Sequence, residues 1–88
     1  MESSQRQNAQ QLVLHKPGPD LLEIMVEMIP DRYVLRPGDE MVIEAELDGA
    51  PFDITPYNGG LQIYPGNAFD PAVTINGMPV EADWDTPT

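Results

Sequence analysis

Prolines and glycines cut this chain into short apolar runs, and this punctuation limits its fold more than any other feature. The 88 residues include 10 prolines and 7 glycines, most of which fall between the apolar runs. Short runs of about 4–8 residues bounded by Pro, Gly, Asn and Asp are typical of all-β domains. We therefore predict an all-β fold, either a small antiparallel β-sandwich or a partly open barrel.

The clearest strand covers residues 41–48. Two sets of residues alternate along it with a period of two. One set is apolar (Met41, Ile43, Ala45 and Leu47), and the other is mostly acidic (Val42, Glu44, Glu46 and Asp48). Such alternation predicts one face in the core and one in solvent. The preceding Arg36-Pro-Gly-Asp39 has the composition of a turn, which makes residues 33–35 a short strand before it.

Other segments give weaker signals. Residues 21–29 fit a strand with Leu22, Ile24, Val26 and Met28 inward, which we favour because the neighbouring segments have strand patterns. A short helix capped by Asp20 and ended by Pro30 stays open as the alternative. Residues 61–64 and 72–75 are predicted strands, and Asn58-Gly59-Gly60 is a predicted turn before the first of them. Asn76-Gly77 predicts a hairpin joining 73–75 to 78–80, because both positions of a type I′ turn need positive φ.

The predicted organisation is one small domain with two polar ends. Residues 1–11 are almost entirely polar and are expected to form an extended N-terminal arm; residues 12–84 form the β domain and 85–88 a tail. No apolar signal segment or membrane-spanning run is recognised, so a soluble protein, cytoplasmic or virion-associated, is expected. The chain lacks cysteine, so its small core has no disulfide support.

The stretch Tyr33-Val-Leu-Arg-Pro-Gly-Asp-Glu-Met-Val-Ile43 resembles the strand–turn–strand of many immunoglobulin-like and cupredoxin-like sandwiches. The resemblance covers eleven residues and implies a sandwich. A cupredoxin copper site needs a cysteine and two histidines, whereas this chain has only His15. The copper function is therefore not carried over.

Charge is distributed unevenly along the chain. Residues 1–19 have a net charge of +1, from Glu2, Arg6 and Lys16, whereas residues 20–88 have a net charge of −12. Such a body repels nucleic acid and anionic membranes, and it attracts basic proteins or cations. An acidic surface also serves solubility alone, and both interpretations stay open.

Catalytic and cofactor motifs are not found in the sequence. Ser3 and Ser4 lie in the polar arm without a nucleophile motif, and His15 is the only histidine. Glu44-x-Glu46-x-Asp48-Gly resembles the opening of a calcium loop, but Thr55 stands where a bidentate glutamate is needed. The carboxylates are therefore predicted to form a solvated face. We expect no enzyme activity, no cofactor and no metal.

The remaining candidates point to protein partners. Aromatic residues of the second half are expected mainly in the core, but Tyr57 and Trp84 are candidate interface anchors. The predicted function is a non-enzymatic structural or interaction module, an accessory or decoration-type subunit of an assembly such as a virion, with possible homo-oligomers. An acidic nucleic-acid mimic is the first alternative, and a small acid/base enzyme is the second. The predicted partner-binding residues are Gln5, Arg6, Gln7, Gln10, Glu44, Glu46, Asp48, Tyr57 and Trp84.

Overall fold

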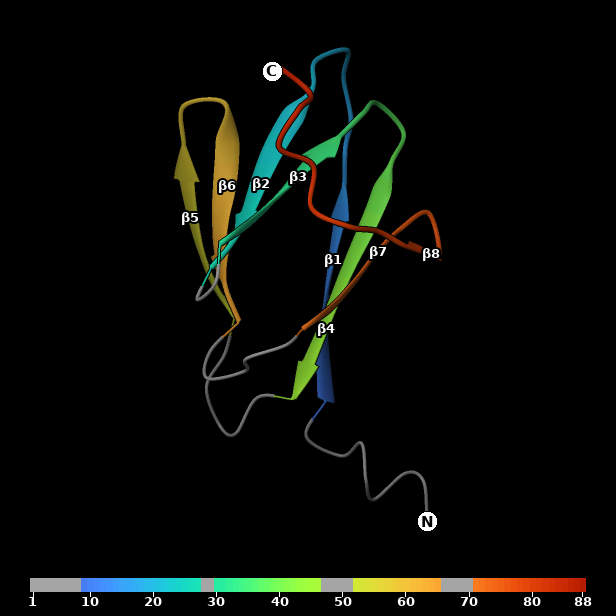
Figure 1. Cartoon of the computed structure of the whole chain (residues 1–88), viewed down its shortest axis with the longest axis vertical. Helices are drawn as coiled ribbons and strands as arrows, with labels where there is room; N and C mark the ends of the chain where they lie inside the picture. Colours follow the sequence, from blue (N-terminus) through green and yellow to red (C-terminus); the bar gives the residue numbers. More distant parts are fainter. Residues whose placement is uncertain (1–8, 28–29, 47–51, 66–70) are drawn as a thin grey trace.

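The computed structural model describes residues 9–27, 30–46, 52–65 and 71–88, and these form two four-stranded sheets (Figure 1). The first sheet has the order β1 (Ala9–His15), β4 (Glu40–Glu46), β7 (Ala72–Ile75) and β8 (Met78–Pro79). The second has the order β3 (Asp31–Leu35), β2 (Leu22–Val26), β6 (Gly60–Tyr64) and β5 (Asp53–Tyr57). Within the described ranges there is no helix, hence none that could cross a membrane. The predicted all-β class is confirmed.

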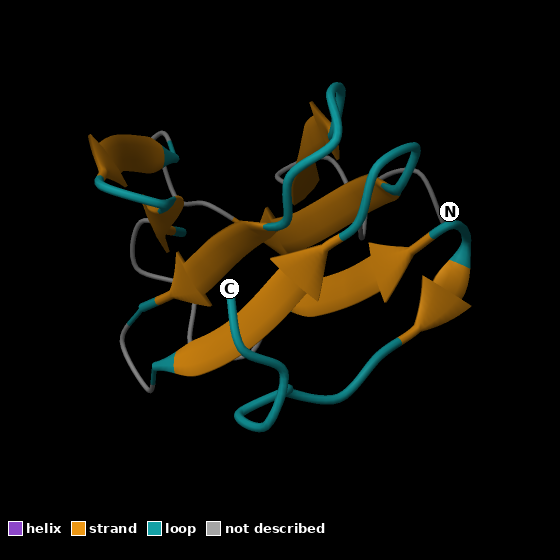
Figure 2. Ribbon diagram, turned by 90° about the horizontal axis from the view of Figure 1, so that it is seen from above, coloured by secondary structure: helices purple, strands orange, loops and turns teal. Residues whose placement is uncertain are grey.

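The two sheets form the layers of a sandwich (Figure 2). The chain changes sheet between β1 and β2, β3 and β4, β4 and β5, and β6 and β7. The core cluster lies between the layers and takes side chains from both sheets, namely Ile24, Val26, Tyr33, Leu35, Met41, Ile43, Ile63 and Val73. Among the described strands no pair joins one sheet to the other, so the sandwich stays open at its edges.

One strand pair departs from the antiparallel expectation. β2 and β6 pair in parallel, with Glu23 opposite Gly60 and Val26 opposite Ile63, while the other described pairs are antiparallel. A parallel pair cannot be closed by a tight hairpin, so the intervening chain crosses to the other sheet and back. The second sheet is therefore mixed.

The strand predicted at 41–48 is confirmed as β4, whose described part is Glu40–Glu46. Met41, Ile43 and Ala45 are buried and Val42 and Glu44 are only half-buried, as the alternation predicted. Leu47 and Asp48 lie outside the described residues, and the predicted inward position of Leu47 is untested.

All three predicted turns form, and the one near residues 58–60 joins β5 to β6 with Gly59 at φ +94°. Gly38 has φ +86° in the turn of residues 36–39, where the Asp39 amide donates to the Arg36 carbonyl at 2.9 Å. Asn76 and Gly77 have φ of 55° and 82°, as the hairpin prediction required. The Asn76 side chain binds the Asp39 carboxylate and the Glu40 amide, each at 2.9 Å, and so joins the two turns.

The open alternative at residues 21–29 resolves to a strand, β2, because Ile24 and Val26 both enter the core. Two strands were not predicted in full. β5 contains Pro56 and is exposed throughout, so it carries no apolar alternation. β1 begins at Ala9, so the last three residues of the predicted polar arm pair with β4; residues 1–8 lie outside the described part.

Candidate functional site

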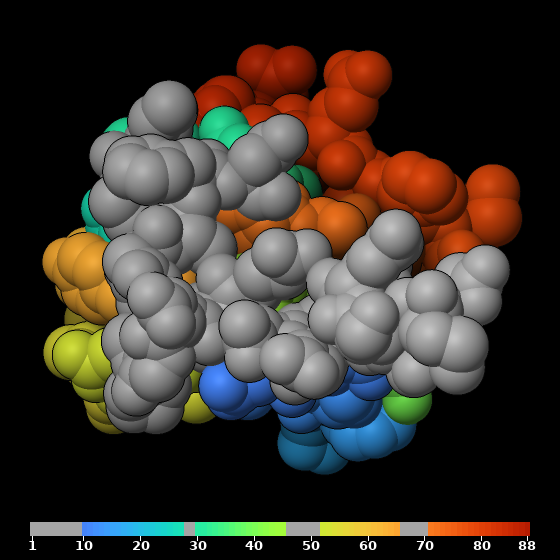
Figure 3. Space-filling model, turned by 90° about the horizontal axis from the view of Figure 1, so that it is seen from below, coloured from blue at the N-terminus to red at the C-terminus, as the bar shows by residue number. Residues whose placement is uncertain are grey.

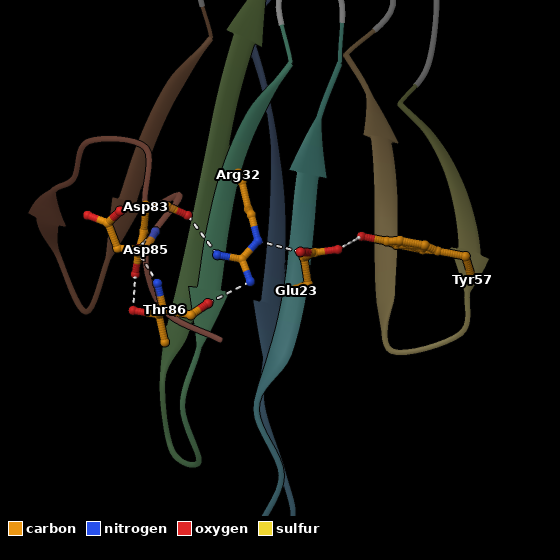
Figure 4. A network of polar contacts seen from close by, with 6 residues as sticks. All are labelled: Glu23, Arg32, Tyr57, Asp83, Asp85 and Thr86. Carbon is orange, nitrogen blue, oxygen red and sulfur yellow. Dashed lines mark hydrogen bonds and ion pairs between the residues drawn. The ribbon is translucent and has the colours of Figure 1, made fainter. Parts of the chain in front are cut away.

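A chain of polar contacts crosses the second sheet on the side facing away from the core (Figure 4). Tyr33 and Leu35 of β3 belong to the core cluster, so Arg32 and Val34 face the opposite side, and yet both are buried. The Arg32 Nε donates to one carboxylate oxygen of Glu23 on the neighbouring β2. A buried guanidinium thus has a carboxylate partner beside it.

Glu23 also accepts a hydrogen bond from across the sheet. The Tyr57 hydroxyl donates to its second oxygen at 2.5 Å, although β6 separates β5 from β2. Gly60 of β6 lies between these two residues in the register and supplies no side chain. A Cβ there would lie 2.5 Å from the Glu23 carbonyl oxygen and 2.7 Å from the Tyr57 hydroxyl. Gly60 therefore makes the contact possible.

The Arg32 guanidinium also holds the C-terminal segment. Its Nη1 donates to the Asp83 carbonyl at 2.9 Å, and its Nη2 donates to the Thr86 carbonyl at 2.7 Å. The Asp83 amide in turn donates to the Arg32 carbonyl at 2.6 Å. These three bonds fix residues 83–86 along the outer edge of β3.

Residues 83–86 form a turn that is capped by the Asp83 side chain. Asp83 Oδ1 accepts from the amides of Asp85 and Thr86, each at 3.0 Å, and Oδ2 accepts from the Thr86 hydroxyl at 2.6 Å. An aspartate that binds the backbone two and three residues ahead stabilises a tight turn. Trp84 stands within this turn with 57% of its surface exposed.

The hydrogen bonds of the network favour the ionised forms of Glu23 and Asp83 and the neutral form of Tyr57. The Arg32 hydrogen bond lowers the pKa of Glu23, and the Tyr57 hydrogen bond lowers it further. Partial burial, together with the Glu23 carboxylate, raises the pKa of Tyr57 to about 12. The Thr86 hydroxyl and the turn amides lower the pKa of Asp83. A general acid or base works best with a pKa near neutral, and these shifts move each group away from it. The hydrogen bonds of the network form a clamp that joins β5, β2, β3 and residues 83–86.

The predicted partner-binding residues fall into three groups. Gln5, Arg6, Gln7 and Asp48 lie outside the described residues. Gln10 is exposed on β1 and Glu44 is half-buried on β4, both in the first sheet, where the Gln11 amide donates to Glu44 at 3.4 Å; Glu46 ends β4. Tyr57 and Trp84 are exposed at the two ends of the network on the second sheet. The acidic strand and the aromatic candidates are therefore on different sheets.

Apart from Tyr57, the residues that build the network were not recognised as site residues from the sequence. Arg32 is one polar residue before an apolar run, and nothing in its spacing names Glu23 or Asp83 as a partner. A local signal did exist at Asp83-Trp-Asp-Thr86, since Asp followed by Thr three residues later favours a side-chain-capped turn. Among the described residues, no group of three or more His, Asp or Glu is placed to hold a metal ion.

Comparison with known proteins adds no relative. The sequence matches no protein-family model, and neither a curated protein nor a solved structure is significantly similar to it.

Proposed function

We propose that this protein is a non-enzymatic interaction module that docks on a basic protein surface through Trp84, as an accessory subunit of a larger assembly. The observation that carries the proposal is the exposed indole held within a turn whose backbone is fixed at both ends by Arg32. Exposed tryptophans are frequent anchors of protein interfaces.

Rigidity of the turn supports the proposal. Binding normally costs free energy for ordering the groups that make contact, and a turn already ordered in the free protein reduces that cost. The turn is ordered by the Asp83 cap and by the two Arg32 bonds, both independent of any partner. The backbone that carries Trp84 is thus held in a defined position before binding.

Charge around Trp84 defines the kind of partner. Glu81 and Asp85 are exposed on either side of it, and the chain has a net charge of −11. Complementary charge speeds association and rejects acidic competitors. The expected partner is therefore a basic surface with an apolar pocket for the indole, for example on a subunit of a multi-subunit particle such as a virion.

The test begins with cross-linking in the native source, which identifies the neighbouring chain, followed by binding titrations of the purified pair. Trp84→Ala should weaken binding by about thirtyfold or more, as loss of an interface anchor of roughly 2 kcal/mol does. Its free energy of unfolding should change by no more than about 0.5 kcal/mol, because the side chain is mostly exposed.

Tyr64→Ala is the matched control, since Tyr64 is an exposed aromatic residue of β6, 39% exposed. It should bind within about threefold of wild type. Asp83→Ala, which removes the cap and leaves the indole, should weaken binding by an intermediate factor. Equal binding by the Trp84 variant and wild type would refute the proposal. If the partner binds DNA, and that DNA competes with this protein for the same surface, the result would instead support the nucleic-acid-mimic alternative.

A further inference from the structure

The outer edge of β1 carries a row of backbone groups that no described strand occupies. The Lys16 amide donates to the Asp39 carbonyl and the Lys16 carbonyl accepts from the Gly38 amide, so Lys16 faces β4. In an antiparallel ladder, alternate residues bond to the same neighbour. Leu14, Leu12 and Gln10 therefore bond toward β4, while Gln11, Val13 and His15 direct their N–H and C=O groups outward.

The other described edges are each blocked. The edge of β3 is covered by residues 83–86, through the Asp83–Arg32 backbone bond. β8 has two residues, one of them Pro79. β5 contains Pro56, which has no N–H, and begins with Asp53. Prolines, charges and short length are the features that keep sheet edges from pairing.

β1 has none of these protections. It is seven residues long, and its sequence Ala-Gln-Gln-Leu-Val-Leu-His contains no proline and no acidic residue. Seen from below, β1 reaches the surface away from the C-terminal segment, with β1 in blue and the segment in red (Figure 3). Within the described ranges, the edge therefore has no pairing strand and lies apart from the C-terminal segment.

We propose that a second copy of this chain pairs with β1, edge to edge and antiparallel, so that two first sheets become one continuous sheet. Symmetry about Leu12 places Ala9 opposite the partner's His15 and Gln11 opposite the partner's Val13. Every outward-facing residue of the strand then faces another outward-facing residue, and the entire strand is paired. The half-buried Leu12 meets its own copy on the core side of the sheet.

The charge distribution favours β1 as the place where a second copy binds. Two chains of net charge −11 repel each other, so they associate best where acidic residues are fewest. β1 lies in the portion of the chain with positive net charge. The strand contains no Asp or Glu, so no carboxylate of one β1 would face a carboxylate of the other β1. Added salt should strengthen this dimer by screening the remaining repulsion, whereas it should weaken docking of Trp84 on a basic partner.

The test measures the mass of the full chain by sedimentation equilibrium over about 1 µM to 1 mM, a range that detects weak dimers. Wild type should pass from 9.7 kDa to twice that mass. Val13→Pro removes an outward N–H from each strand, so two hydrogen bonds per dimer are lost and the dimer dissociation constant should rise about tenfold or more. Val13→Lys should do the same by placing a charge on the edge.

Ile54→Pro and Ile54→Lys are matched controls on the edge of β5. Ile54 is β-branched and 40% exposed, against 45% for Val13. Its N–H also points outward, since it alternates with Tyr57 and Thr55 beside the Asn58-Gly59 turn. Circular dichroism verifies that each variant is folded; if Val13→Pro unfolds, Val13→Lys gives the result alone.

Loss of dimer in the Val13 variants, with dimer retained in the Ile54 variants, supports the proposal. Wild type that stays at 9.7 kDa throughout the range, in low and high salt, overturns it. Equal effects of the Val13 and Ile54 variants overturn it as well, because the contact would then not be at β1. The Trp84 variant should dimerise normally, so failure here is separate from failure of the proposed function.

Discussion

Tyr57 reaches Glu23 across a strand that has no side chain at the crossing point. Gly60 fills this position in the register, and its neighbours on both sides are close to where a Cβ would stand. A glycine covered by an aromatic ring from the neighbouring strand recovers packing that the missing side chain would have supplied. The residue is therefore required here for space and not for an unusual φ.

Gly60→Ala should lower the free energy of unfolding by roughly 1–3 kcal/mol, the usual cost of inserting a methyl group into a packed site. The reason is the 2.5 Å distance to the Glu23 backbone oxygen, which cannot rotate away as a side chain would. Urea denaturation measures the change. The double variant Gly60→Ala with Tyr57→Ala should stay destabilised, because the clash with the Glu23 backbone remains. If the double variant regained the full stability of Tyr57→Ala, the clash would be with the Tyr57 ring alone.

Glu23 makes the free energy of unfolding depend on pH. Its pKa is lowered from 4.5 in the folded state, so its contribution is present above that value and is lost as pH falls through the folded pKa. Glu23→Gln should therefore be less stable than wild type near neutral pH, with the difference shrinking on acidification. Denaturation at a series of pH values measures it. Glu81→Gln, an exposed change outside the network, is the control; if the Glu23 difference stays constant with pH, the assigned ion pair is wrong.

At the scale of elements, β1 shows that backbone pairing can extend a strand into polar sequence. Gln10 and Gln11 are exposed, yet they lie opposite Ala45 and Glu44 of β4. Gln10 contributes backbone hydrogen bonds to β4, and Gln11 contributes its side-chain amide on Glu44; neither contributes through burial. The first sheet therefore begins at Ala9, within the segment that was predicted to be a polar arm.

Two truncations separate arm from strand. Deleting residues 1–8 should leave the free energy of unfolding nearly unchanged, because they offer no core side chain. Deleting residues 1–11 should cost about 1–2 kcal/mol more, since the pairs opposite residues 44–46 are lost. Thermal and urea unfolding of both proteins measure the difference. Equal stability of the two truncated proteins would show that Ala9–Gln11 add nothing to the sheet.

Sequence patterns predicted the elements whose side chains alternate or whose turns need special φ. β4 has apolar residues at every second position, Met41, Ile43 and Ala45, and Asn76-Gly77 has the residues of its turn, so both were found. β5 was missed because its side chains are all exposed and Pro56 interrupts it. The Glu23–Arg32–Asp83 contacts were missed because they depend on which strands become neighbours, which local periodicity does not encode. Tyr57 and Trp84 were predicted to be interface anchors; both are exposed, and their role in an interface stays a prediction.

At the scale of the whole molecule, the sandwich separates two surfaces of different character. The edge of β1 is uncharged through Leu14 and presents backbone groups, whereas the turn at Trp84 is acidic and presents an indole. They belong to opposite sheets of the fold. A dimer through β1 would therefore leave both copies of Trp84 available and would give the module two equivalent anchors for an assembly.

The long sequence separation of the clamp's contacts governs how the chain reaches this structure. Tyr57 and Glu23 are 34 residues apart, and Arg32 and Asp83 are 51 apart. Chains dominated by such distant contacts fold in about milliseconds to seconds, because large loops must close before the contacts repay them. The β5–β6 hairpin must reach β2 before Tyr57 can bind Glu23. Residues 83–86 cover the outer edge of β3, so any form of the chain that lacks this contact would leave that edge open to another strand.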